Sequence, residues 1–157
     1  MHHRAIMLAG LALILASPAL ADGDRPAKDS GDWSVRRQAG ETRYELRKGN
    51  SYFAVTCTNP RFGGGATFDI VLKGIDSTAH SETRVFVGGQ EYDLRHGALG
   101  VGVTDCAACS KAFLALWQAL RDPHVDRIEL KRGETSVRLP ARGGDTALGN
   151  CTSDRER

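Results

Sequence analysis

The sequence lacks the charge imbalance that marks many binding proteins. Lysine and arginine number 21 against 19 aspartate and glutamate residues, which gives a formal net charge of +2 at pH 7. Nucleic-acid-binding domains normally carry a strong basic excess or a basic stripe. The pairs Arg36–Arg37 and Lys131–Arg132 are too small for that, and we interpret them as solvated strand edges. We therefore expect no nucleic-acid partner.

Recognisable catalytic motifs are also missing. No Gly-x-Ser-x-Gly elbow occurs, and the glycine run 63–65 has no Lys-Ser or Lys-Thr after it, as a phosphate-binding loop would. His80, His96 and His124 fall in predicted loops, where we expect exposed side chains, and none has metal-ligand spacing from another ligand. We expect no metal and no cofactor. A further alternative is a hydrolase whose site is assembled across the fold and carries no local motif.

The N-terminus has the layout of a secretory signal peptide. Arg4 precedes a twelve-residue apolar run at 5–16, and a small-x-small motif ends at Ala21. The run is too short to span a bilayer, and no second run is long enough, so we expect no transmembrane segment after processing. Cleavage after Ala21 would remove residues 1–21 and leave a periplasmic or secreted protein. The alternative is a buried N-terminal helix.

The chain has four cysteines, and all lie beyond the predicted cleavage site: Cys57, Cys106, Cys109 and Cys151. An even number in an exported chain indicates two disulfides. Four cysteines allow three pairings, and the sequence does not choose among them. A Cys57–Cys151 bridge would close a loop of about ninety residues, worth roughly 4–5 kcal/mol on the chain-entropy model.

Alternating apolar and polar residues predict a mainly β domain. Gly-rich turns separate eight or nine short strands at 33–36, 43–47, 51–56, 67–73, 83–87, 91–95, 99–103, 125–130 and 135–139. In the segment 99–103, Gly100 and Gly102 leave one face nearly bare, so we expect something bulky to pack there. Strands at this spacing favour an antiparallel sandwich or an open barrel.

One amphipathic helix is predicted late in the chain, at 107–121. Its apolar residues recur at the spacing of one helix face, Asp105 is a candidate N-cap, and Asp122-Pro123 ends it. From these patterns we predict four parts of the chain: a signal peptide at 1–21, a flexible leader at 22–32, one β-rich domain at 33–151 and a charged tail at 152–157.

Cys106-Ala107-Ala108-Cys109 opens this helix. A C-x-x-C motif at a helix N-terminus is typical of thiol–disulfide enzymes, in which the helix dipole stabilises the first thiolate. Cys106 would then be the nucleophile and Cys109 the resolving thiol. A thioredoxin fold has the motif early, in a βαβ unit, whereas here it follows a run of strands. The alternatives are two structural cysteines, or a zinc site built on all four.

The order of features resembles a known family. Gly31-Asp32-Trp33-Ser34-Val35 opens the fold, the C-x-x-C region leads into the helix, and Gly144-Asp145-Thr146-Ala147-Leu148 precedes the last cysteine. This order is similar to the invasion-associated locus B family of exported α-proteobacterial proteins. That family tends to have a cysteine shortly after the opening tryptophan, where this chain has Arg36 and Arg37. The resemblance implies a periplasmic or secreted β-rich protein linked to host interaction, with no catalytic residues to transfer.

We therefore expect an exported, non-enzymatic binding or interaction protein of the bacterial envelope, whose partner is a protein or another envelope component. One version is a periplasmic inhibitor of a secreted enzyme such as lysozyme. The alternative is a periplasmic thiol–disulfide redox protein that uses Cys106 and Cys109. The state of that cysteine pair separates the two, because a redox enzyme needs the pair reducible and accessible.

Overall fold

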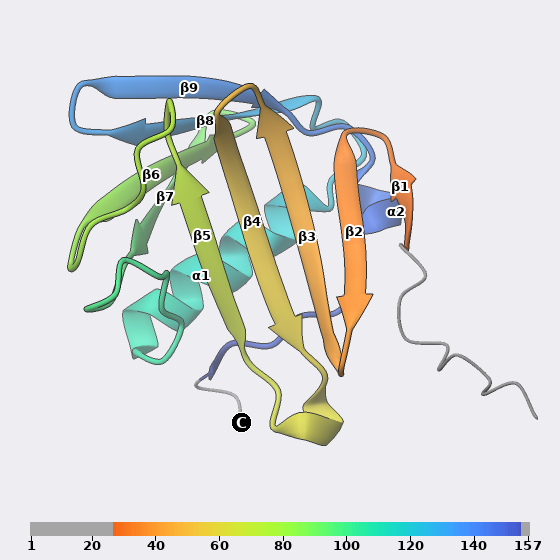
Figure 1. Cartoon of the computed structure of the whole chain (residues 1–157). Helices are drawn as coiled ribbons and strands as arrows, with labels where there is room; N and C mark the ends of the chain where they lie inside the picture. The colour runs from red at the N-terminus through yellow and green to blue at the C-terminus, as the bar shows by residue number, and fades with distance from the viewer. Residues whose placement is uncertain (1–26, 155–157) are drawn as a thin grey trace, which may run out of the picture.

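The computed structural model describes residues 27–154, which form two antiparallel sheets with one long helix (Figure 1). The first sheet has five strands in the order β1-β2-β3-β4-β5: β1 (Ala27–Ser30), β2 (Trp33–Gln38), β3 (Glu41–Lys48), β4 (Ser51–Thr58) and β5 (Ala66–Val71). The second has four in the order β7-β6-β8-β9: β6 (Glu82–Val87), β7 (Gln90–Arg95), β8 (Arg127–Arg132) and β9 (Thr135–Pro140). The predicted mainly β class and antiparallel sandwich are confirmed.

Three helical elements accompany the sheets: η1 (Pro60–Phe62), α1 (Ala107–Leu120) and α2 (Gly144–Ala147). Helix α1 runs across the inner face of the five-stranded sheet, on the far side in the view of Figure 1. There Trp117 meets Tyr44 of β3 edge-on, with ring centroids 5.3 Å apart. Phe113, one turn earlier, stacks on Trp117 at 6.0 Å. The predicted helix and its core-facing apolar side are thus confirmed.

The strand alternation explains how one core is shared by both sheets. Every second residue of β3 and β4 points inward, so Tyr44, Leu46, Phe53 and Val55 are buried in the core. The second sheet contributes inward side chains to the same cluster: Val85, Val87, Leu94, Ile128, Leu130 and Leu139. Burial of this apolar surface is the main term that stabilises the fold.

The predicted strand at 99–103 is wrong. Leu99 is 92% exposed, and the segment makes only isolated bridges, through Gly102 to Phe68 of β5 and to His96. Gly100 has a left-handed backbone (φ +74°), which interrupts an extended strand. The expected bulky neighbour is present, because the Phe68 ring occupies the space that a Cβ on Gly102 would need. The segment is therefore a strap that crosses from β5 toward the end of β7.

Details at the helix start and at both ends differ from expectation. The N-cap of α1 is Cys106, whose Sγ accepts a hydrogen bond from the Cys109 backbone N–H, and not Asp105. The segment 22–32, expected to be a flexible leader, includes β1, which pairs with β2. At the other end, Ser153 is fully buried and shares a hydrogen bond of 2.7 Å with Ser110 of α1. The predicted signal peptide at 1–21 lies outside the described residues.

Candidate functional site

The cysteines form two disulfides of different character. Cys57, at the end of β4, is bonded to Cys151 across a sequence separation of 94, with the two Cα atoms 5.4 Å apart. Cys57 is 5% exposed and belongs to the core cluster. This bridge fastens the C-terminal segment to the five-stranded sheet and is a structural staple.

The second disulfide joins Cys106 and Cys109, whose Cα atoms are 5.0 Å apart, at the start of α1. The structure therefore selects one of the three pairings that the sequence left open. Cys106 is partly exposed, whereas Cys109 is 7% exposed. Sulfur chemistry from solvent would accordingly begin at Cys106.

The backbone at the start of α1 places a hydrogen-bond donor at the Cys106 sulfur. Its Sγ lies 3.0 Å from the Cys109 backbone nitrogen, which donates to it, and the first turn of α1 has no acidic residue. The partial positive charge of a helix N-terminus stabilises an anion at this position, as does a backbone N–H donor. If the bond were reduced, the helix would hold Cys106 as a good leaving group and nucleophile.

A groove of about 420 Å³ lies beside this disulfide, between β7 and α1. Its lining comes from both elements: Gln90, Glu91, Tyr92, Asp93 and Arg95 of β7, and Ala108, Cys109, Lys111, Ala112 and Ala115 of α1. The three alanines have small side chains, so they leave the groove open along the helix. Cys109 lines one wall, so the disulfide is next to the groove and not isolated on a convex surface.

The histidines behave differently from one another. His80 and His124 are exposed, as expected, but the expectation for His96 is wrong, because it is only 2% exposed. Its Nδ1 donates to the Gly100 carbonyl at 3.0 Å, which leaves Nε2 as an acceptor 3.1 Å from the Thr83 hydroxyl. Burial lowers the pKa of His96, and the nearby positive charge of Arg132 lowers it further.

Arg132 shares the polar partners of the buried His96 side chain. Its guanidinium donates to the Thr83 hydroxyl (3.1 Å), the Ser77 hydroxyl (2.6 Å) and the Ile70 carbonyl (3.0 Å). The interpretation of Lys131–Arg132 as a solvated edge is therefore wrong for Arg132, which connects β8 to β5 and β6. Although Ser77 Oγ lies 3.3 Å from His96 Nε2, the hydroxyl is already engaged by Arg132 and by Ile70. We interpret the cluster as a polar cross-link between the sheets.

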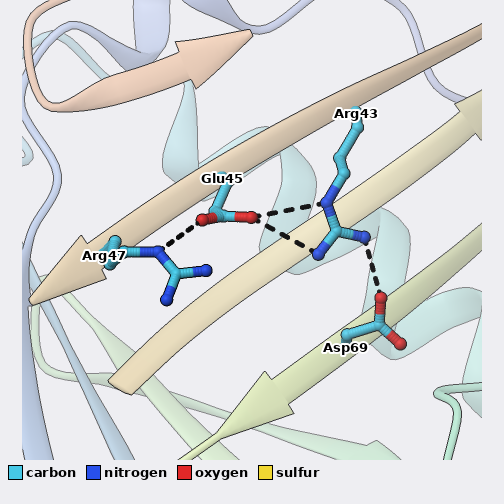
Figure 2. A network of polar contacts seen from close by, with 4 residues as sticks. All are labelled: Arg43, Glu45, Arg47 and Asp69. Atoms are coloured by element: carbon cyan, nitrogen blue, oxygen red, sulfur yellow. Dashed lines mark hydrogen bonds and ion pairs between the residues drawn. The ribbon is translucent and has the colours of Figure 1, made fainter. Parts of the chain in front are cut away.

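The outer face of the five-stranded sheet carries a second polar network (Figure 2). Arg43 donates to Asp69 on β5 at 2.8 Å and to Glu45 at 3.4 Å, and Arg47 donates to Glu45 at 2.7 Å. These side chains lie over Ala54 of β4, which pairs with both Glu45 and Asp69 and is fully buried. The network shields the sheet, as paired charges on exposed strands commonly do.

The two ends of the domain meet at a third cluster. The Asp32 carboxylate accepts from the Arg142 backbone N–H at 2.9 Å and from its guanidinium Nε at 3.0 Å, and the guanidinium bond is the main reason that the pKa of Asp32 is lowered. Trp33 donates from its indole to the Ala141 carbonyl at 3.2 Å. A Cβ on Gly144 would overlap the Leu120 carbonyl oxygen. The motifs at 31–35 and 144–148 are therefore parts of one packing contact.

In comparison with known proteins, residues 31–148 match the family model named YfjT. The chain belongs to the YfjT family. The YfjT match begins and ends at the two motifs that pack together, and it includes Cys57, Cys106 and Cys109, with Cys151 three residues beyond it. No curated protein and no solved structure matches the chain. The resemblance to the invasion-associated locus B family stays a prediction.

Metal-ligand clusters and membrane-spanning helices are both absent among the residues that the structure describes. Among residues 27–154, no group of three His, Cys, Asp or Glu side chains is arranged to hold a metal ion. In the same span no helix is both long enough and apolar enough to cross a membrane. The Cys106–Cys109 bond and its groove are the arrangement with the clearest chemistry, and the sequence had indicated the cysteines but not the groove.

Proposed function

We propose that this protein is exported and exchanges disulfides with protein partners through Cys106 and Cys109. The observation that carries the proposal is the bond between these two cysteines at the first turn of α1, where residue Cys106 is partly exposed and residue Cys109 is buried. Two disulfides suggest an oxidising, extracytoplasmic environment. The predicted signal peptide at 1–21 supplies the route there.

The proposed reaction is a thiol–disulfide exchange in two steps. A partner thiolate attacks Cys106 Sγ, a new S–S bond forms, and the electron pair of the broken bond leaves with Cys109, which becomes a thiolate. A second partner thiolate then attacks the partner sulfur of this mixed disulfide and expels Cys106 as a thiolate. The partner dithiol is oxidised by two electrons and the protein disulfide is reduced by two. Exchange with another disulfide runs the same steps in reverse and restores the bond.

The test is a reduction titration in thiol buffers of stepped potential, followed by alkylation and mass spectrometry of each cysteine pair. The Cys57–Cys151 bond is the control within the same molecule. We expect Cys106–Cys109 to be reduced at potentials well above about −300 mV, where structural bridges resist reduction, and Cys57–Cys151 to resist. A Cys106–Cys109 pair that stays oxidised together with the control would refute the proposal.

A second candidate is the non-enzymatic binding role, in the envelope or as an inhibitor of a secreted enzyme. The observation that favours it is the bond from the Cys109 N–H to Cys106 Sγ, because a disulfide that serves as a helix cap can be purely structural. In that role the reduction titration would find both bridges resistant. The protein would then act through its surface alone.

A further inference from the structure

Strand β7 is an edge strand, with β6 on one side only. Gly88 and Gly89 form a two-residue hairpin turn, so Val87 and Gln90 are a hydrogen-bonded pair, and hydrogen-bonded pairs recur at every second residue. The backbone groups of Tyr92 therefore face β6, and those of Glu91 and Asp93 face away from it.

The outward side of this edge is used only at its far end. There the Arg95 carbonyl accepts a hydrogen bond of 3.1 Å from the Val103 N–H, which belongs to the strap. Within residues 27–154, no backbone hydrogen bond reaches Glu91 or Asp93 from that side. The Glu91 carbonyl accepts only an exposed hydrogen bond of 3.3 Å from the Gln90 side-chain amide, which an added strand could displace. Glu91 and Asp93 thus offer N–H donors and C=O acceptors at strand spacing, and both residues line the groove.

The groove supplies room for side chains from an added strand. On a strand paired to β7, alternate side chains would point toward α1, where Ala108, Ala112 and Ala115 leave space and Cys109 lines the wall. The other side chains would lie beside Glu91 and Asp93 on the outer face of the sheet. Asp93 is exposed and makes no ion pair with any residue in 27–154, so a basic side chain there would gain a partner.

We propose that the groove binds an extended, cysteine-bearing segment of a partner polypeptide, which adds to β7 as a further strand and carries its sulfur to the Cys106–Cys109 bond. The alignment of backbone donors and acceptors selects an extended chain, because a helix satisfies its own backbone groups and cannot pair with a strand edge. The sulfur step rests on the proposed function, whereas the docking step does not.

Docking is tested without sulfur chemistry. The probe is an acetylated and amidated seven-residue peptide in which lysine alternates with valine and a central serine replaces the cysteine. With the oxidised protein, we expect amide hydrogen exchange at Glu91 and Asp93 to slow by roughly tenfold or more at saturation, because their N–H groups become hydrogen-bonded. Unchanged exchange at both amides, or protection confined to another surface, would overturn the proposal.

Backbone methylation of the probe sharpens this test. In an added strand, the N–H groups of alternate residues face β7 and the others face solvent. Methylating the nitrogens of one alternate set should therefore abolish binding, and methylating the other set should preserve it. Equal tolerance of both sets would overturn strand addition. Replacing the lysines by glutamates should weaken binding, since the carboxylates would face Glu91 and Asp93.

Variants of the protein give a matched comparison. Glu91→Pro removes the outward N–H, at a position where an edge strand tolerates proline, and Glu91→Ala removes only the side chain. Both variants lose the carboxylate, but only the proline variant loses the backbone bond, so we expect it to bind about tenfold or more weakly than the alanine variant. Equal binding by the two variants would contradict the proposal.

The sulfur step is measured separately in Cys109→Ser, where Cys106 is free. The cysteine form of the peptide and a single cysteine, each as a mixed disulfide with thionitrobenzoate, are compared for their rates of thionitrobenzoate release. We expect the peptide to react roughly tenfold faster or more, because docking raises the local concentration of its sulfur. Protection of β7 with an inert Cys106 would refute the proposed function and leave docking standing. A reactive Cys106 without protection of β7 would overturn the docking proposal and leave the proposed function standing.

Discussion

Removing the two disulfides separately should have very different effects on stability. The perturbations are the paired variants Cys57→Ala/Cys151→Ala and Cys106→Ala/Cys109→Ala. The first opens a loop with a sequence separation of 94, and the second a loop with a separation of 3. On the chain-entropy model, the longer loop constrains the unfolded chain by roughly 4–5 kcal/mol, and the two bridges differ by roughly 3 kcal/mol.

Native-state contacts should narrow this difference in stability without reversing it. Cys57 is buried in the core, so its truncation adds a small packing cost to the entropy term. The second pair of substitutions removes the sulfur cap of α1, which on the scale of ordinary N-caps costs about 0.5–2 kcal/mol. The Cys57–Cys151 variant should therefore remain the less stable of the two.

Guanidinium unfolding under non-reducing conditions measures both free energies of unfolding. The Cys57–Cys151 variant should also show a larger m-value, because its unfolded chain exposes more surface when the long loop is open. Equal losses in the two variants, or a larger loss for Cys106–Cys109, would show that Cys57–Cys151 is not the principal staple. That result would also weaken the reasoning that leaves Cys106–Cys109 free for exchange.

Three further outcomes test the packing and the titration. Trp117→Ala should lower the free energy of unfolding by about 3–5 kcal/mol in guanidinium, because the ring is in the core. The control Gln118→Ala, at an exposed position, should change it by less than about 0.5 kcal/mol. Equal effects of the two substitutions would place the apolar face of α1 outside the core. Burial lowers the pKa of His96, so the unfolded state takes up the proton first and the melting temperature should fall as pH drops below about 6.5. In His96→Gln that acid-side fall should be smaller, and an identical pH profile would contradict it. Gly144→Ala should lower stability by roughly 1–3 kcal/mol, since the Leu120 oxygen occupies the space, and an unchanged melting temperature would contradict this packing.

Strand alternation and the apolar spacing of a helix predicted secondary structure correctly where nothing else in the segment opposed them. The hairpin of β3 and β4 follows from alternation around the Lys48–Ser51 turn, and α1 follows from its apolar face. Alternation predicted a strand wrongly at 99–103. There Gly100 has a left-handed backbone, and Gly102 packs against the Phe68 ring. Alternation reports which residues can share a face, and it does not report whether a neighbouring strand is available to pair.

Side-chain surroundings were harder to foresee than elements. His96 and Arg132 look like surface residues in the sequence, yet they join with Thr83 in a buried polar cross-link, because β6, β8 and the strap converge there. The motifs at 31–35 and 144–148 were recognisable as an order of features. Only the fold showed that they pack against each other.

The sequence by itself determined most of the elements and the number of bridges: short alternating runs make strands, one apolar stripe makes a helix, and four cysteines make two disulfides. These follow from interactions between residues close in the chain, or from simple parity. The tertiary structure decided which cysteines meet, that Cys106 is more exposed than Cys109, and that β7 is an edge strand beside Cys109. Those properties depend on contacts between residues far apart in sequence, and no local pattern encodes them.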